Sequence, residues 1–187
     1  MNITTLLVPT YTHMLKALSG WLAKAQAHSP ADEDGLLTAR LAPDMFPLVA
    51  QIRFVCVQAR EAVYRLTGQP FPPSLTDLLN DARSGGEHPG TIADAQACIA
   101  ETLALLEALD PDALDIRGDA PVEHALPMGI IFDFTADQYA RDWTLGQFYF
   151  HLMVAYAILR HRGVDLGKAD YIPHLFANIR PGTMPGA

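Results

Sequence analysis

The 187-residue chain has little cysteine, and it has no long apolar run. Its two cysteines, Cys56 and Cys98, are too few for a disulfide framework, so the sequence predicts a reducing, cytoplasmic compartment. No stretch approaches the ~20 apolar residues of a membrane-spanning helix. The first residues also lack the basic start and apolar core of a signal peptide. These absences predict a protein that does not interact with membranes.

Basic residues are scarce as well. Lys and Arg number 13 against 21 Asp and Glu, which gives a net charge of -8. An acidic surface repels phosphate, so nucleic acid is excluded as a partner. Hydrophobic residues make up 50% of the chain, and the mean hydropathy of +0.11 is high for a monomer. We therefore expect a homodimer that buries surplus apolar helix faces or the C-terminal tail.

Strong catalytic motifs are also absent. The sequence contains no phosphate-binding glycine loop, HExxH, CxxC or GxSxG. GVDLGK at residues 163–168 follows a helical pattern, not a strand, and indicates a helix end and a surface turn. The residues thus select no reaction, and both enzymatic and non-enzymatic functions stay open.

What the sequence does contain is helical periodicity. Apolar residues recur three and four positions apart in four segments, which predicts long helices over about 6–27, 45–67, 92–109 and 145–160. Three of these helices are expected to start with a cap residue followed by a supporting residue in the first turn. The pairs are Asp44 and Pro47, Thr91 and Asp94, and Thr144 and Gln147. The leucine and isoleucine residues expected to meet at the centre are Leu18, Ile52, Leu106 and Leu152.

Two shorter elements complete the predicted fold. The first is a short helix over 74–82, capped by Ser74, which follows a proline-rich stretch. The second is at 122–134, VEHALPMGIIFDF, where the apolar residues alternate with a period of two, which is typical of a hairpin. Thr135 and Gln138 cap a further helical turn. The fold class is therefore all-α, a four-helix bundle with a small β-hairpin between the third and fourth long helices. Residues 1–175 form one domain, and residues 176–187 form a tail that is flexible or at a dimer contact.

The most informative polar residues are Gln147 and His151. They are four positions apart on the last predicted helix, so they share one face, beside its core stripe. Two interpretations of His151 stay open: a packed histidine bonded to a carbonyl or carboxylate, or part of a small-molecule pocket at the mouth of the bundle. Four further residues are candidates for this pocket: Asp44, Gln51, Tyr11 and Tyr149. Each of them can equally be a cap, core or boundary residue.

Two blocks of the sequence resemble a known family. RLAPDMFPLVAQIRF at 40–54 and FYFHLMVAYAILRHRGVDLGKADY at 148–171, with TLALLEALDP at 102–111, are similar to an uncharacterised bacterial and fungal family of unknown function. That family lies in the DinB/YfiT-like superfamily of proposed metalloenzymes. The resemblance implies a DinB-like four-helix bundle in an up-down-down-up arrangement. Residues 77–90 depart from it, because they look longer than the family's pattern.

The resemblance also implies a metal site, but the matching residues are changed. Many superfamily members bind a divalent metal through one histidine on the second helix and an HxxxH pair on the fourth. Here the pair reads Gln147-xxx-His151, and the second helix offers only Asp44 or Gln51. A transition metal prefers three imidazole or thiolate ligands, and an amide oxygen is a weak donor. The sequence therefore predicts no cofactor; a metal, if present, would have His151, Gln147 and Asp44 as ligands.

These observations predict a DinB-like protein of unknown function, with a small-molecule pocket near His151 and without a complete metal triad. One alternative is a metal-dependent enzyme of the thiol-cofactor transferase or isomerase type, which the resemblance implies. The other alternative is a non-enzymatic dimeric interaction or stress-response protein.

Overall fold

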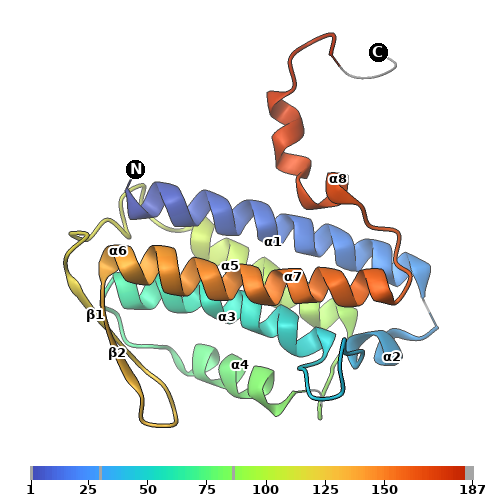
Figure 1. Cartoon of the computed structure of the whole chain (residues 1–187), viewed down its shortest axis with the longest axis horizontal. Coiled ribbons are helices and arrows are strands. Elements are labelled where there is room, and N and C mark those ends of the chain that lie inside the picture. Colours follow the sequence, from blue (N-terminus) through green and yellow to red (C-terminus); the bar gives the residue numbers. More distant parts are fainter. Residues whose placement is uncertain (1, 30, 86, 184–187) are drawn as a thin grey trace.

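The computed structural model describes residues 2–29, 31–85 and 87–183. Its four long helices, α1 (Ile3–His28), α3 (Leu48–Leu66), α5 (Ile92–Glu107) and α7 (Leu145–His161), pack side by side (Figure 1). Helices α1 and α7 run in one direction, whereas α3 and α5 run in the other (Figure 1). This is the up-down-down-up arrangement that the resemblance implies, and the predicted all-α fold with one small hairpin is confirmed.

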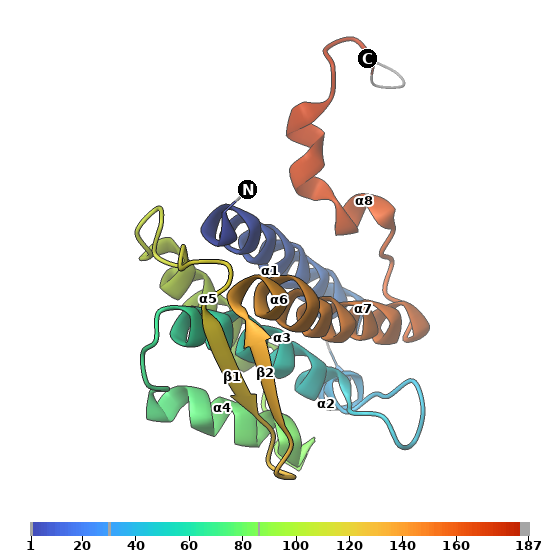
Figure 2. The same cartoon turned by 60° about the vertical axis from the view of Figure 1, so that its left-hand side comes forward.

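Shorter elements connect and cover the long helices. Helix α2 (Glu33–Leu37) precedes α3, and α4 (Pro73–Ser84) returns the chain along α3. Strands β1 (Pro121–Ala125) and β2 (Ile131–Thr135) are antiparallel, with His124 opposite Phe132. The hairpin starts at the end of the bundle and extends past α3 towards α4 (Figures 1 and 2). It leads into α6 (Ala136–Gln138) and the π-helical turn η1 (Tyr139–Thr144).

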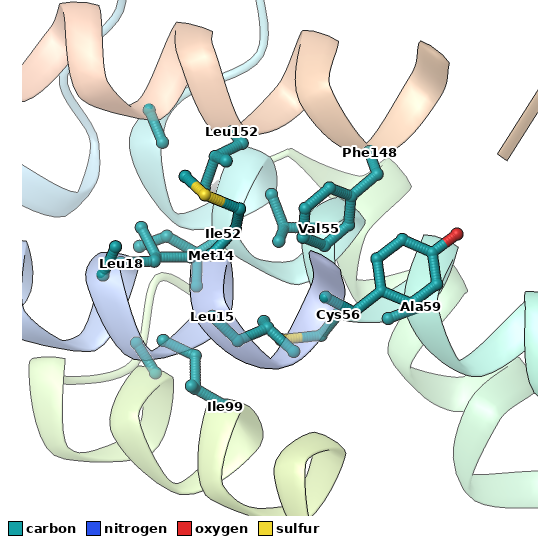
Figure 3. Packing of buried hydrophobic residues seen from close by; sticks show 14 of the residues in the cluster. Met14, Leu15, Leu18, Ile52, Val55, Cys56, Ala59, Ile99, Phe148 and Leu152 are labelled. Atoms are coloured by element: carbon teal, nitrogen blue, oxygen red, sulfur yellow. The ribbon is translucent and has the colours of Figure 1, made fainter. Parts of the chain in front are cut away.

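The core is built around α3, in which nearly every residue is buried. Side chains from all four long helices form one continuous apolar cluster, part of which Figure 3 shows around Ile52, Leu18 and Leu152. Leu18, Ile52 and Leu152 are fully buried and Leu106 is 2% exposed, all in this cluster. The predicted central residues are therefore confirmed.

The predicted start of α3 is wrong. Asp44 was expected to cap this helix, but it is exposed and the helix begins at Leu48, with Pro47 in the N-cap position. The cause is local sterics, because Phe46 precedes a proline and therefore avoids the α conformation. By contrast, the expected capping box of Thr91 and Asp94 is confirmed at the start of α5.

The predicted cap of the last long helix is also wrong. Thr144 has helical dihedral angles, φ -68° and ψ -40°, because α6, η1 and α7 form one uninterrupted helical segment. Its hydroxyl instead contacts the Tyr11 hydroxyl at 2.7 Å and donates to the Gln58 carbonyl at 3.3 Å. The helical segment starts at the predicted capping box of Thr135 and Gln138. Similarly, α4 begins at Pro73 without the cap expected from Ser74.

The C-terminal part leaves the bundle (Figures 1 and 2). Helix α8 (Lys168–Tyr171) lies against α1, and the 3-10 helix η2 (Pro173–Asn178) follows it. The predicted domain boundary at residue 175 falls inside η2, and residues 184–187 of the predicted tail lie outside the described residues. Within the described ranges, no helix is long and apolar enough to cross a membrane.

Candidate functional site

A cavity of about 790 Å³ lies between α3, α4, the hairpin and the start of α7. Helix α3 forms one wall with Phe54, Gln58, Glu61 and Arg65, which follow one another at four, three and four positions. This spacing places all four side chains on one face of the helix. The face lies opposite α4 and the hairpin, so α3 presents apolar residues to the bundle and a mostly polar stripe to the cavity.

The π-helical turn and the hairpin form the facing wall. Trp143 of η1 packs against three rings of the hairpin, with centroid distances of 4.3 Å to His124, 5.2 Å to Phe132 and 5.8 Å to Phe134. A π-turn widens a helix locally and is frequent at functional sites. Here it joins the hairpin to the bundle and brings Trp143 and His124 into the cavity lining.

The cavity extends along α3, with Arg65 at one end and His151 at the other. Two contacts fix the orientation of the His151 ring. Its Nδ1 is 2.8 Å from Gln51 Oε1, and its ring stacks on Phe54 at 4.6 Å. The Gln51 amide nitrogen donates to the Phe46 carbonyl, which turns the amide oxygen towards His151. Because an amide oxygen only accepts, His151 Nδ1 carries the proton and Nε2 is the acceptor nitrogen.

Burial sets the charge of the titrating groups in the cavity. Burial lowers the pKa of His151 to about 4, and burial together with the nearby Arg65 charge lowers the pKa of His124 to about 4. Both imidazoles are therefore neutral at pH 7. Burial also raises the pKa of Glu61, although the charges of Arg65 and Arg83 oppose this shift. Desolvated titrating groups of this kind cluster at functional sites.

The cavity also gathers buried polar atoms that have no hydrogen-bond partner. Among the described residues these include Gln58 Oε1, Arg65 Nε, His124 Nδ1 and Trp143 Nε1, and all four residues line this one cavity. Gln58 is 8% exposed and His124 is 4% exposed. Buried polar groups in native proteins nearly always have partners, so these four atoms are unused hydrogen-bonding groups of the residues that line the cavity. Each atom has less than 1 Å² of accessible surface and therefore lies behind the lining.

The structure brings together only some of the predicted site residues. His151 and Gln147 line the cavity, and Gln51 orients His151 from behind. Asp44, Tyr11 and Tyr149 do not line it. Asp44 is exposed in the loop before α3, Tyr11 is buried in the bundle core, and Tyr149 packs beside Phe148.

Sequence reasoning missed four of the polar lining residues: Glu61, Arg65, His124 and Trp143. Two of them follow Gln51 and Gln58 in the helical stripe of α3, and this polar stripe on an otherwise apolar helix was the available signal. His124 and Trp143 carried no such signal, because the hairpin and the π-turn bring them to the cavity from distant parts of the chain.

The residues present do not fit the three-histidine metal site that the superfamily implies. His151 Nδ1 and Gln51 Oε1 are bonded to each other, Gln147 offers a neutral amide, and Asp44 is outside the cavity. Over residues 2–29, 31–85 and 87–183, no group of three or more His, Cys, Asp or Glu side chains is arranged to hold a metal ion. One imidazole with amide oxygens is a poor donor set for a transition metal.

The fold and the cavity define a DinB-like helical-bundle protein. A crystal structure of a DinB family member from Shewanella denitrificans is similar, with a TM-score of 0.72, 30% sequence identity, and coverage of 97% of this chain and 95% of that chain. The chain belongs to the family described as a domain of unknown function, DUF1993, whose model matches residues 3–172. This confirms the resemblance found in the sequence. A comparison with curated proteins finds no match.

Proposed function

We propose that the protein binds a small organic molecule in the cavity between α3, α4, the hairpin and η1, and that it does so without a metal. The observation that carries this proposal is the cavity itself, whose lining combines aromatic rings with the polar side chains of α3 and two neutral imidazoles. The volume of about 790 Å³ is within the ~300–1,000 Å³ of typical small-molecule sites. Apolar rings at the His151 end and polar groups at the Arg65 end give the cavity the mixed lining of such sites.

Filling the cavity tests this proposal. Ala125 lines the cavity from the end of β1, and its exposed position tolerates a larger side chain. Ala125→Trp should weaken binding of the neutral dye Nile red, measured by fluorescence, at least about fivefold because the indole occupies the ligand's space. Ala27→Trp on the exposed side of α1 is the matched control and should bind the dye like the wild type. Equal dye binding by both variants would contradict the proposal.

The metal-dependent enzyme is the alternative, and elemental analysis separates it from our proposal. Protein purified without chelators or metal-affinity resin is expected to contain far less than one equivalent of zinc, nickel or iron. The physical reason is the donor set, since His151 and two glutamine amides supply too little binding energy to hold these ions against cellular chelators. Near-stoichiometric metal that disappears in His151→Ala would contradict this prediction and support the metalloenzyme.

We further propose that the protein is a homodimer with the C-terminal segment at the contact. Leu175 and Phe176 of η2 are 46% and 48% exposed, on a segment that leaves the bundle (Figure 2). Exposed apolar side chains in such a segment are typical of an interaction surface. Light scattering at micromolar concentration should give the dimer mass, and Leu175→Asp with Phe176→Asp should give the monomer. A wild-type monomer under these conditions would contradict the proposal.

We also propose a cytoplasmic location. Cys56 on α3 and Cys98 on α5 are both free cysteines. Free thiols on packed helices suit a reducing compartment, which supports the proposal.

A further inference from the structure

We infer that Cys56 and Cys98 form an oxidation site for hydrogen peroxide, at which Cys98 is oxidised first and Cys56 then joins it in a disulfide between α3 and α5. The site is separate from the cavity proposed to bind a ligand, since neither cysteine lines that cavity. Three features of the structure support it: the position of the two thiols opposite each other, the charge beside Cys98, and the access of small molecules to Cys98 but not to Cys56.

The two cysteines face each other across a pair of helices. Helices α3 and α5 run in the same direction (Figure 1), and Arg60 of α3 donates from Nε to the Thr102 hydroxyl of α5 at 2.8 Å. Cys56 precedes Arg60 by four positions and Cys98 precedes Thr102 by four positions, which is about one helical turn. The cysteines therefore lie opposite each other one turn earlier. A hydrogen bond joins their thiols, which brings the two sulfurs into the contact from which a disulfide can form.

A buried arginine places positive charge beside Cys98. Arg60 Nη2 donates to the Cys98 carbonyl at 2.9 Å, and it lies 3.9 Å from Cys98 Sγ and 3.2 Å from Glu101 Oε2. The hydrogen bond from the Cys56 thiol lowers the pKa of Cys98, and the Arg60 charge adds to this effect, although burial and the nearby carboxylate oppose it. The same hydrogen bond, together with burial, raises the pKa of Cys56. The thiolate, which is the reactive form of cysteine, therefore forms on Cys98.

Peroxide has access to Cys98 but not to Cys56. Cys98 is partly exposed and lines two cavities, of about 180 Å³ and 410 Å³, between α3, α4 and α5. Both are much larger than the ~30 Å³ that a water molecule occupies in the liquid, and hydrogen peroxide is only slightly larger than water. Cys56 has no exposed surface and belongs to the core cluster (Figure 3). An accessible thiolate next to a second, protected thiol is typical of cysteines that respond to oxidants.

The oxidation has two steps. The Cys98 thiolate attacks one oxygen of hydrogen peroxide, the O–O bond breaks, and the leaving hydroxide takes up a proton to become water. The product is a sulfenic acid, in which the Cys98 sulfur is oxidised while the peroxide is reduced. The Cys56 sulfur then attacks the Cys98 sulfur, so that an S–S bond replaces the S–O bond, and the hydroxide leaves as water with the Cys56 proton. Cellular thiols can reduce the disulfide again, as a reducing compartment requires.

The inference is tested on the full-length protein, treated with hydrogen peroxide under native conditions and mapped by mass spectrometry. The wild type is expected to form a disulfide between Cys56 and Cys98 of one chain. In Cys56→Ser no thiol resolves the sulfenic acid on Cys98, so dimedone should trap it. In Cys98→Ser the remaining thiol is buried, so at least about tenfold less dimedone adduct is expected than in Cys56→Ser.

The contribution of Arg60 is measured as the pH dependence of alkylation by iodoacetamide, in protein that also carries Cys56→Ser. Arg60→Gln removes the positive charge, so the midpoint of the rate profile of Cys98 should rise by at least about 0.5 pH unit. Arg141→Gln is the matched control and should keep the midpoint, because Arg141 pairs with Asp142 at the surface. An unmoved midpoint in Arg60→Gln would remove Arg60 from the site.

Three results would overturn the inference itself. The first is wild-type protein that keeps both thiols free after peroxide treatment while circular dichroism shows that it is folded. The second is a disulfide that joins two chains instead of α3 and α5 of one chain. The third is equal dimedone labelling of Cys56 and Cys98 in the two single variants, because the order of oxidation would then not depend on burial and charge.

Discussion

Leu152→Ala is expected to lower the free energy of unfolding by about 2–5 kcal/mol. Leu152 is fully buried on α7 and contributes to the core cluster shown in Figure 3. Truncation removes apolar surface from the core and leaves a cavity, because surrounding helices relax only in part. Urea denaturation followed by circular dichroism measures the change, since a shift in midpoint without a change in slope reports stability alone.

Phe150 provides the control for this substitution on the same helix. It is 58% exposed, so Phe150→Ala should change the free energy of unfolding by less than about 0.5 kcal/mol. If Leu152→Ala cost no more than Phe150→Ala, Leu152 would not belong to the core. The orientation of α7, and with it the position of His151 one residue earlier, would then be wrong.

The fold could be predicted because its main determinant is periodic. Apolar residues such as Leu18 and Ile52 recur at helical spacing, and a helix that buries such a stripe must pack against others. Helix ends were less predictable, because several contacts compete for the same polar side chain. Thr144 has the sequence context of a cap, yet its hydroxyl contacts Tyr11, which is 133 positions away in sequence.

The site was only partly predictable, for a related reason. The spacing of Gln147 and His151 pointed to the correct face of α7, and both residues line the cavity. Glu61 and Arg65 look like ordinary surface residues in the sequence, because charged side chains are mostly exposed. The polar stripe of α3 distinguishes this face from the apolar one, but it does not show that the face is covered. The α4 helix and the hairpin, which cover it, come from other parts of the chain.

The stability of the protein is expected to fall between pH 6.5 and pH 4, because two buried histidines must remain neutral. Burial lowers the pKa of His151 and of His124 to about 4 in the folded protein. In the unfolded chain the pKa of a histidine is about 6.5. Between these values the unfolded state binds protons that the folded state does not bind, so acidification favours unfolding.

The sign and the size of this effect follow from proton linkage. Stabilisation by the neutral imidazoles is fully present above pH 6.5 and is lost as the pH falls towards 4. Each histidine contributes a slope of at most about 1.4 kcal/mol per pH unit, and less where water still reaches the ring. Glu61 acts in the opposite direction, because its raised pKa lets the folded state take up a proton first.

Single substitutions separate the histidines from the other titrating groups. His151→Gln and His124→Gln should each reduce the slope of unfolding free energy against pH between 4.5 and 6.5, measured by urea denaturation at several pH values. Phe150→Ala removes no titrating group and should keep the wild-type slope. An unchanged slope in both histidine variants would mean that these imidazoles become charged in the folded protein. In that case their partners, Gln51 for His151 and the rings of Trp143 and Tyr139 for His124, would have to accommodate a cation.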